Sequence, residues 1–343
     1  MMDRTRTTAF IKNWMLPIAM VTGASVYLLY HAIPSLHPAG PFLSASVSFL
    51  QPLLIFSMLF LTFCRIEPKD LKPHRWHWWL LLIQGGLFTI LGLLALAVMK
   101  WLPDNHHDYV VLIESAMLCL ICPTATAAAV VTRKLGGDVA GITTYTVLIN
   151  MLTALLVPLV VPLIQPMEGM TFWQAFSMIV AKIFPLLIMP CLCAWLVRYL
   201  FPVLHKKLLS YPDLAFYIWA VALTLAIAVT VKSIVNSDMS VGLLLLMSMI
   251  SLLCCILQFA LGRHVGSRYR PKRHSVRLEP GPALERGRQI RKVTAGQSLG
   301  QKNTVFAIWM GYTFMTPETA IVGGLYSIWH NLYNSWQLYR AGK

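Results

Sequence analysis

Two short polar segments interrupt apolar stretches of the sequence, and their side chains and backbone could bind a small polar molecule. Residues 123–126 read Pro-Thr-Ala-Thr, and residues 300–304 read Gly-Gln-Lys-Asn-Thr. Proline and glycine disfavour helix, and an interrupted helix leaves backbone N–H and C=O groups without partners. In an apolar environment each such group costs several kcal/mol, so protein, water, an ion or a ligand must satisfy it. A freed helix N-terminus attracts anions, and a freed C-terminus attracts cations.

Cys119 and Cys122 have the C-x-x-C spacing that is typical of metal or redox sites. The sequence shows no matching second pair and no histidine cluster beside them. All seven cysteines fall within apolar stretches. We therefore interpret them as small packing residues, and we predict neither a metal centre nor a cofactor.

The composition is that of a membrane protein with many spans. Of the 343 residues, 57% are hydrophobic and 12% are charged, whereas soluble domains carry roughly 25% charged residues. A spanning helix needs roughly 20 apolar residues. We predict an all-α integral membrane protein, a single transmembrane domain over 1–343, with ten spans at 12–33, 41–64, 77–99, 109–132, 139–164, 173–198, 213–234, 241–262, 293–313 and 317–338.

The distribution of the basic residues between the predicted loops agrees with ten spans. The net charge is +15, which in a soluble protein would suggest nucleic acid as a partner. With the N-terminus in the cytoplasm, only Lys100 and Lys232 fall in loops on the opposite side, and Lys182 and Lys302 fall within spans. Ten basic residues lie in the long loop 263–292. The positive-inside rule thus predicts a multi-pass cell-membrane protein with both termini cytoplasmic, which contacts membrane lipid and no nucleic acid.

Ten spans divide into two halves of five, 12–164 and 173–338, which run through the membrane in opposite directions. This is the geometry of an inverted repeat. The two polar segments lie in the fourth span of each half. Interrupted spans at corresponding positions indicate a transporter site, although Pro123 could be an ordinary kink and Gly300 an ordinary packing glycine.

Three stretches resemble the bile acid:sodium symporter family. They are residues 122–164, which begin CPTATAAAVV, residues 300–309, which read GQKNTVFAIW, and residues 323–335, which contain Trp-His-Asn. The resemblance implies that the fourth and ninth helices are broken and cross behind a substrate cavity. It also implies a secondary active transporter, not an enzyme, that carries a bile acid, a steroid or a small carboxylate by alternating access.

The resemblance also assigns candidate site residues. Substrate contacts are implied at Pro123, Thr124, Ala125, Thr126, Asn303, Thr304 and Asn331. The coupling and ion-site positions of the family correspond to Gln84, Ala128, Ala129, Thr146, Ser298, Gln301 and Lys302.

Several of these positions have lost the oxygen donors that sodium requires. Ala128 and Ala129 carry no side-chain oxygen, and Ser298 stands in place of a glutamate. Lys302 replaces a glutamine and brings an ammonium group to the place of a cation. Two unit charges about 4 Å apart repel by about 4 kcal/mol at an effective dielectric of 20, which is about a thousandfold in affinity. We expect sodium coupling to be altered or absent.

The role of Lys302 remains open at this stage. It could be a fixed internal cation, a proton carrier, a direct partner of an anionic substrate, or a structural lysine that snorkels or pairs with an acid such as Glu114. For the whole protein, the alternative is a non-transporting membrane sensor or a subunit of a larger complex. An integral-membrane enzyme is disfavoured because the histidines of the predicted cytoplasmic loops are scattered, without a paired carboxylate motif.

Overall fold

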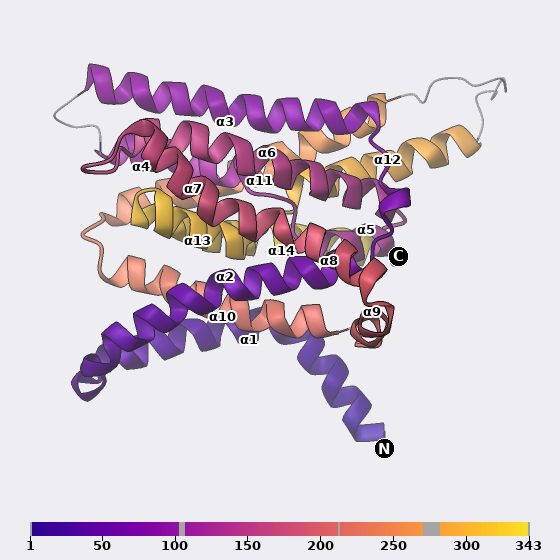
Figure 1. The fold of residues 1–343 in the computed structure, drawn as a ribbon, viewed down its shortest axis with the longest axis horizontal. Helices are drawn as coiled ribbons and strands as arrows, with labels where there is room; N and C mark the ends of the chain where they lie inside the picture. Colours follow the sequence, from indigo (N-terminus) through magenta and orange to yellow (C-terminus); the bar gives the residue numbers. More distant parts are fainter. Residues whose placement is uncertain (1, 103–106, 212, 270–281, 342–343) are drawn as a thin grey trace.

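The structure is a computed structural model that describes residues 2–102, 107–211, 213–269 and 282–341 (Figure 1). The regular secondary structure of these residues is helical, and most long helices lie along the horizontal direction of Figure 1. The longer helices are α1 (Met2–Ala32), α2 (Gly40–Cys64), α3 (Arg75–Trp101), α6 (Val139–Ile164), α10 (Leu214–Val235), α11 (Val241–Arg268), α12 (Pro282–Gly300) and α14 (Ala320–Ala341). The shorter ones are α4 (His107–Ile121), α5 (Ala128–Lys134), α7 (Phe172–Leu187), α8 (Met189–Leu200), α9 (Pro202–Leu209) and α13 (Thr304–Phe314), with 3-10 turns at Pro34–Ala39, Pro68–Asp70 and Pro317–Thr319.

Six of the described helical segments are long and apolar enough to cross a membrane. They are Pro34–Cys64, Arg75–Trp101, Val139–Ile164, Phe172–Leu200, Leu214–Val235 and Val241–Arg268. This supports a membrane protein with several spans. The count of ten spans and their arrangement as inverted repeats stay predictions, because the other four expected spans contain shorter, broken or more polar helices.

Both predicted interruptions are present. The expected span 109–132 consists of α4 and α5, with the non-helical residues 122–127 between them. The expected span 293–313 lies within α12 and α13, which are separated by residues 301–303. The interpretation of Pro123 as an ordinary kink is therefore wrong, since the chain leaves the helical conformation there for several residues.

The predicted span 173–198 is confirmed as one long apolar segment, Phe172–Leu200. It consists of α7 and α8, which meet at Ile188, with Pro190 in the first turn of α8 where its missing N–H costs nothing. Another sequence prediction needs correction. The basic segment 263–292 is not a loop throughout, because α11 continues to Arg268 and α12 begins at Pro282. Hydropathy could not show this, since arginine and lysine are good helix formers outside the apolar layer. Residues 270–281 lie outside the described part.

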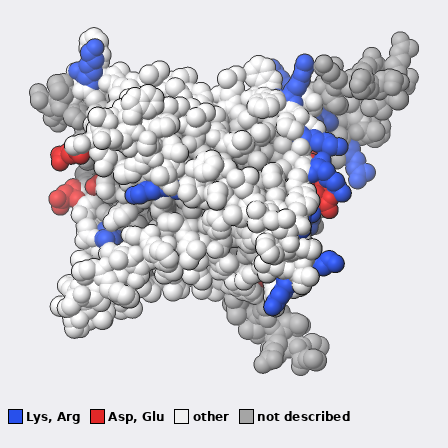
Figure 2. Space-filling model, viewed as in Figure 1, with Lys and Arg blue, Asp and Glu red and all other residues white. Residues whose placement is uncertain are grey.

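Charged side chains gather at the two ends of the molecule. Figure 2 shows most of the visible Lys and Arg at the end where Figure 1 places α5, α9 and the C-terminus. Arg133 and Lys134 lie in the last turn of α5, and Lys206 and Lys207 lie in that of α9. The broad face between the ends is largely uncharged (Figure 2).

Helices α11 and α12 pack closely through small residues. A Cβ atom on Gly262 would lie 2.3 Å from the backbone oxygen of Ala295, and one on Gly266 would lie 2.4 Å from that of Arg291. Both distances are shorter than a van der Waals contact. Small residues let helix backbones approach in this way. The contact fixes α12 up to its last residue, Gly300, where the second interruption starts.

We expect Gly262→Ala to lower the stability of the folded protein by about 1–3 kcal/mol, because the added methyl group forces α11 and α12 apart. Thermal unfolding in detergent measures this. The control is Gly86→Ala on α3, where a Cβ atom meets nothing within 4 Å. If the Gly262 and Gly86 variants unfold at the same temperature, the close packing of α11 and α12 is wrong.

Candidate functional site

The two interruptions cross and pair with each other. The backbone N–H of Ala125 donates to the oxygen of Gln301 over 2.9 Å, and the N–H of Asn303 donates to the oxygen of Pro123 over 2.8 Å. These bonds form a short antiparallel bridge at Thr124. Each broken helix therefore satisfies part of the backbone that the other has freed, which is what a break in an apolar interior requires.

The C-terminal carbonyl groups of α4 are capped by side chains from other helices. The donors are Gln258 Nε2 to Cys119 O (3.1 Å), Lys302 Nζ to Leu120 O (3.0 Å), Thr153 Oγ1 to Ile121 O (3.0 Å), and Gln84 Nε2 to Ile121 O (3.2 Å) and Cys122 O (3.1 Å). With Pro123 O bonded to Asn303, every carbonyl from 119 to 123 has a donor. The end of α4 is thus satisfied within the protein.

The end of α12 is capped in the same manner. The hydroxyl of Thr124 donates to Ser298 O over 2.7 Å, and that of Tyr326 donates to Gly300 O over 2.8 Å. Gln258 also donates to the Tyr326 hydroxyl over 3.1 Å, so one glutamine of α11 connects both broken ends. Thr124 therefore holds the crossing together and does not face the pocket described below.

Lys302 is 2% exposed, and its ammonium group is directed at α4. None of the ion pairs found among the described residues includes it. Glu114 is not its partner, because that carboxylate accepts hydrogen bonds from Gln165 Nε2 over 2.8 Å and from the N–H of Thr316 over 3.1 Å. The proposed Glu114–Lys302 pair is therefore wrong.

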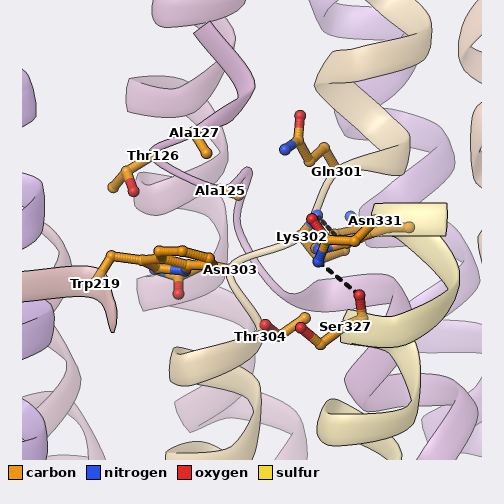
Figure 3. A pocket seen from close by; sticks show the side chains of 11 residues that line it. Ala125, Thr126, Ala127, Trp219, Gln301, Lys302, Asn303, Thr304, Ser327 and Asn331 are labelled. Atoms are coloured by element: carbon orange, nitrogen blue, oxygen red, sulfur yellow. Dashed lines mark hydrogen bonds between the residues drawn. The ribbon is translucent and has the colours of Figure 1, made fainter. Parts of the chain in front are cut away.

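Helix α13 begins at the crossing with a polar cap. Asn303 is its N-cap, and Asn303 Oδ1 accepts a hydrogen bond from the N–H of Phe306 over 3.2 Å. The other half of the amide, Nδ2, is buried and has no partner within the described structure. Gln301 Oε1, on a side chain that points away from Asn303 in Figure 3, is also buried without a partner. Buried polar atoms normally have partners, so these two indicate a bound group or water.

A pocket opens beside these atoms. It is lined by Ala125, Thr126, Ala127, Trp219, Gln301, Lys302, Asn303, Thr304, Ser327, His330 and Asn331, and its volume is about 30 Å³. Figure 3 shows Trp219 of α10 on one side and Lys302 and Asn331 on the other. The amide of Asn331 donates to Ser327 O over 2.6 Å, and His330 Nδ1 accepts from the backbone N–H of Lys302 over 3.4 Å.

The pocket brings together most of the substrate positions that the resemblance implied. Ala125, Thr126, Asn303, Thr304 and Asn331 line it, as do Gln301 and Lys302 of the ion-site positions. Pro123 and Thr124 do not line it. Their contribution is the backbone oxygen and the hydroxyl that close the crossing.

The remaining ion-site positions offer few side-chain oxygens. Thr146 Oγ1 donates to Ile142 O over 2.9 Å, and Gln84 Oε1 accepts from the Tyr145 hydroxyl over 2.7 Å, so each oxygen already has one partner within the protein. Ala128 is fully buried and Ala129 half-buried, and neither has a side-chain oxygen. Ser298 Oγ is buried without a hydrogen-bond partner in the described structure, and it is one oxygen where the family has a carboxylate.

Sequence reasoning missed several residues of the site. Trp219 gave no signal, because tryptophan in an apolar span resembles a lipid contact. Gln258 and Thr153 did give one, since a polar side chain within an apolar helix needs a partner. Their partners are backbone carbonyls far away in the sequence, which no local pattern reveals.

Comparison with known proteins gives one family. A family model described as the SBF-like CPA transporter family matches residues 14–340. No curated protein matches the chain.

We expect Gln84→Leu to destabilise the protein by about 1–3 kcal/mol, because it leaves the buried Cys122 oxygen without a donor. Thr153→Val should cost less, since Ile121 O keeps its bond from Gln84. The double variant should lose more than the sum of the two, because Ile121 O then loses both donors. Thermal unfolding of the three variants checks this, and strict additivity would contradict the shared cap.

Proposed function

Because the chain belongs to the SBF-like CPA transporter family, we propose that it is a secondary active transporter that binds an organic anion at the crossing and moves it by alternating access. The family is one of membrane transporters, which argues against an enzyme. The proposal includes ten spans in two inverted repeats, with α4–α5 and α12–α13 as the broken fourth and ninth spans.

The observation that carries the proposal is the unpartnered donor at the crossing. Asn303 Nδ2 lies in the wall of the pocket at the N-terminus of α13, where the helix dipole favours negative charge. No aspartate or glutamate is among the lining residues. A pocket with a free amide donor and a helix N-terminus, and without carboxylates, favours an anion over a cation.

The dimensions of the pocket bear on the substrate class. A volume of about 30 Å³ holds on the order of two water molecules, whereas pockets for drug-sized ligands measure roughly 300–1,000 Å³. A bile acid or steroid would require a large opening of this site. A small carboxylate requires the least enlargement, and we propose this class, with Trp219 covering its apolar part.

The arrangement of helices supports alternating access. Trp219 belongs to α10, which packs against α1 and α2. The residues on the other side of the pocket belong to the crossing, which is held by α3, α11 and α14. A rigid-body shift between these two groups of helices would open the pocket toward either side of the membrane.

We further propose that the protein lies in the cell membrane with both termini cytoplasmic. The basic end of Figure 2, which includes the ends of α5 and α9, would then face the cytoplasm. A non-transporting sensor or a complex subunit is the second candidate. The absence of side-chain oxygens at Ala128 and Ala129 favours it, because a carrier that has lost its coupling ion could persist as a binding protein.

We expect Asn303→Asp to weaken anion binding roughly tenfold or more, because it places a negative charge in the pocket. The fold should be retained, since aspartate is an equally good N-cap for α13. Thermal shift with small carboxylates and steroid sulfates identifies a binding anion, and its uptake into proteoliposomes measures transport.

The matched control is Asn236→Asp, which lies at the exposed end of α10 and should leave binding and uptake unchanged. Binding without uptake in the wild-type protein would favour the sensor. Equal anion affinity of the wild type and the Asn303→Asp variant would exclude this pocket as the substrate site.

A further inference from the structure

We propose that Lys302 is a built-in cation whose ammonium group occupies the C-terminal end of α4, so that the crossing binds no metal cation and the anion is carried without one. The part concerning the anion rests on the proposed function. The part concerning the cation is a property of the crossing itself and is tested without any transported substrate.

The first argument is the use of the carbonyl oxygens. Metal cations such as sodium bind to oxygen ligands, and a freed helix C-terminus offers them. Here every carbonyl from Cys119 to Pro123 already accepts a hydrogen bond from the protein. Ile121 O accepts two bonds and has no lone pair left, and the other four oxygens keep one each. Among the donors at this end, the ammonium group of Lys302 is the one that carries charge, and it lies where a cation would be attracted.

The second argument is charge balance around a buried ammonium group. Lys302 is 2% exposed, and a buried charge without compensation is very costly. The titratable groups that act on it from the packed helices are the thiols Cys119, Cys122, Cys254 and Cys255, and His330 contacts its backbone N–H. No described ion pair involves Lys302. The groups that favour the charged form are the partial negative charge at the end of α4 and the acceptor Leu120 O.

The third argument separates the roles that the sequence left open. The one hydrogen bond of the ammonium group is to Leu120 O, so the proposal assigns its charge to α4, although Lys302 also lines the pocket. A second cation about 4 Å from it would bind about a thousandfold more weakly at an effective dielectric of 20. The lysine therefore holds the crossing in its binding conformation and excludes a coupling ion from it.

The first experiment measures thermal unfolding of the wild-type protein in sodium, lithium, potassium or choline chloride at constant ionic strength. Since the cation position is filled by the chain, we expect the same unfolding temperature in all four salts. A saturable rise with one metal cation would overturn the proposal, whether or not the protein transports an anion.

The second experiment removes the ammonium group and supplies it from solution. We expect Lys302→Ala to lower the unfolding temperature by about 5 °C. Propylammonium or sodium should restore at least half of the loss, and 1-propanol should not, because the missing group is a charge and not a volume. The control Lys182→Ala removes an exposed lysine near the Phe314 ring and should respond to neither.

Equal restoration by 1-propanol, or a Lys302→Ala variant as stable as the wild type, would overturn the proposal. If this variant does not fold, the unfolding temperatures of the wild type in the four salts test the proposal.

Lys302→Arg distinguishes a fixed charge from a proton carrier, because arginine stays protonated. Anion binding that keeps the wild-type pH profile in Lys302→Arg supports the fixed cation. Loss of a pH dependence that the wild type shows would make Lys302 a proton carrier and contradict the proposal.

Discussion

A broken helix inside an apolar interior must find hydrogen-bond partners for its backbone, and this requirement organises the centre of the molecule. The breaks after Ile121 and after Gly300 lie against each other, and two backbone hydrogen bonds join them. The remaining carbonyl groups of α4 are satisfied by side chains of α3, α6, α11 and the second interruption. These hydrogen bonds hold α3, α6 and α11 at the end of α4, and Gly262 and Gly266 separately allow the close approach of α11 to α12.

The helix C-terminus and the helix N-terminus at the crossing differ in how well their polar groups are satisfied. The C-terminal end of α4 is capped by an ammonium group, a hydroxyl and amide donors. The N-terminal end of α13 is capped by Asn303, yet Asn303 Nδ2 is left without a partner. We therefore propose a crossing that excludes cations and binds an anion, with the pocket beside Trp219.

The sequence predicted the interruptions because proline, glycine and polar residues in an apolar helix have a strong physical cost. Most of the pocket residues, among them Thr126, Asn303 and Asn331, were implied by the resemblance to the transporter family and not by the pattern of polar residues alone. The sequence did not predict Trp219, because its position depends on packing between distant helices. The direction of the Lys302 side chain also depends on such packing, and so the expected pair with Glu114 was wrong. The extension of α11 and α12 beyond the apolar layer could not be read from hydropathy.

The most direct test of the account is electron cryomicroscopy of the protein in a lipid nanodisc, at a resolution that shows backbone and side-chain density. The account predicts that residues 122–127 and 301–303 run antiparallel at mid-membrane, with the ammonium group of Lys302 at Leu120 O. A map in which α4 and α12 continue as regular helices through these residues would contradict it. So would a map in which the Lys302 side chain points away from α4 and a metal ion lies at the helix end.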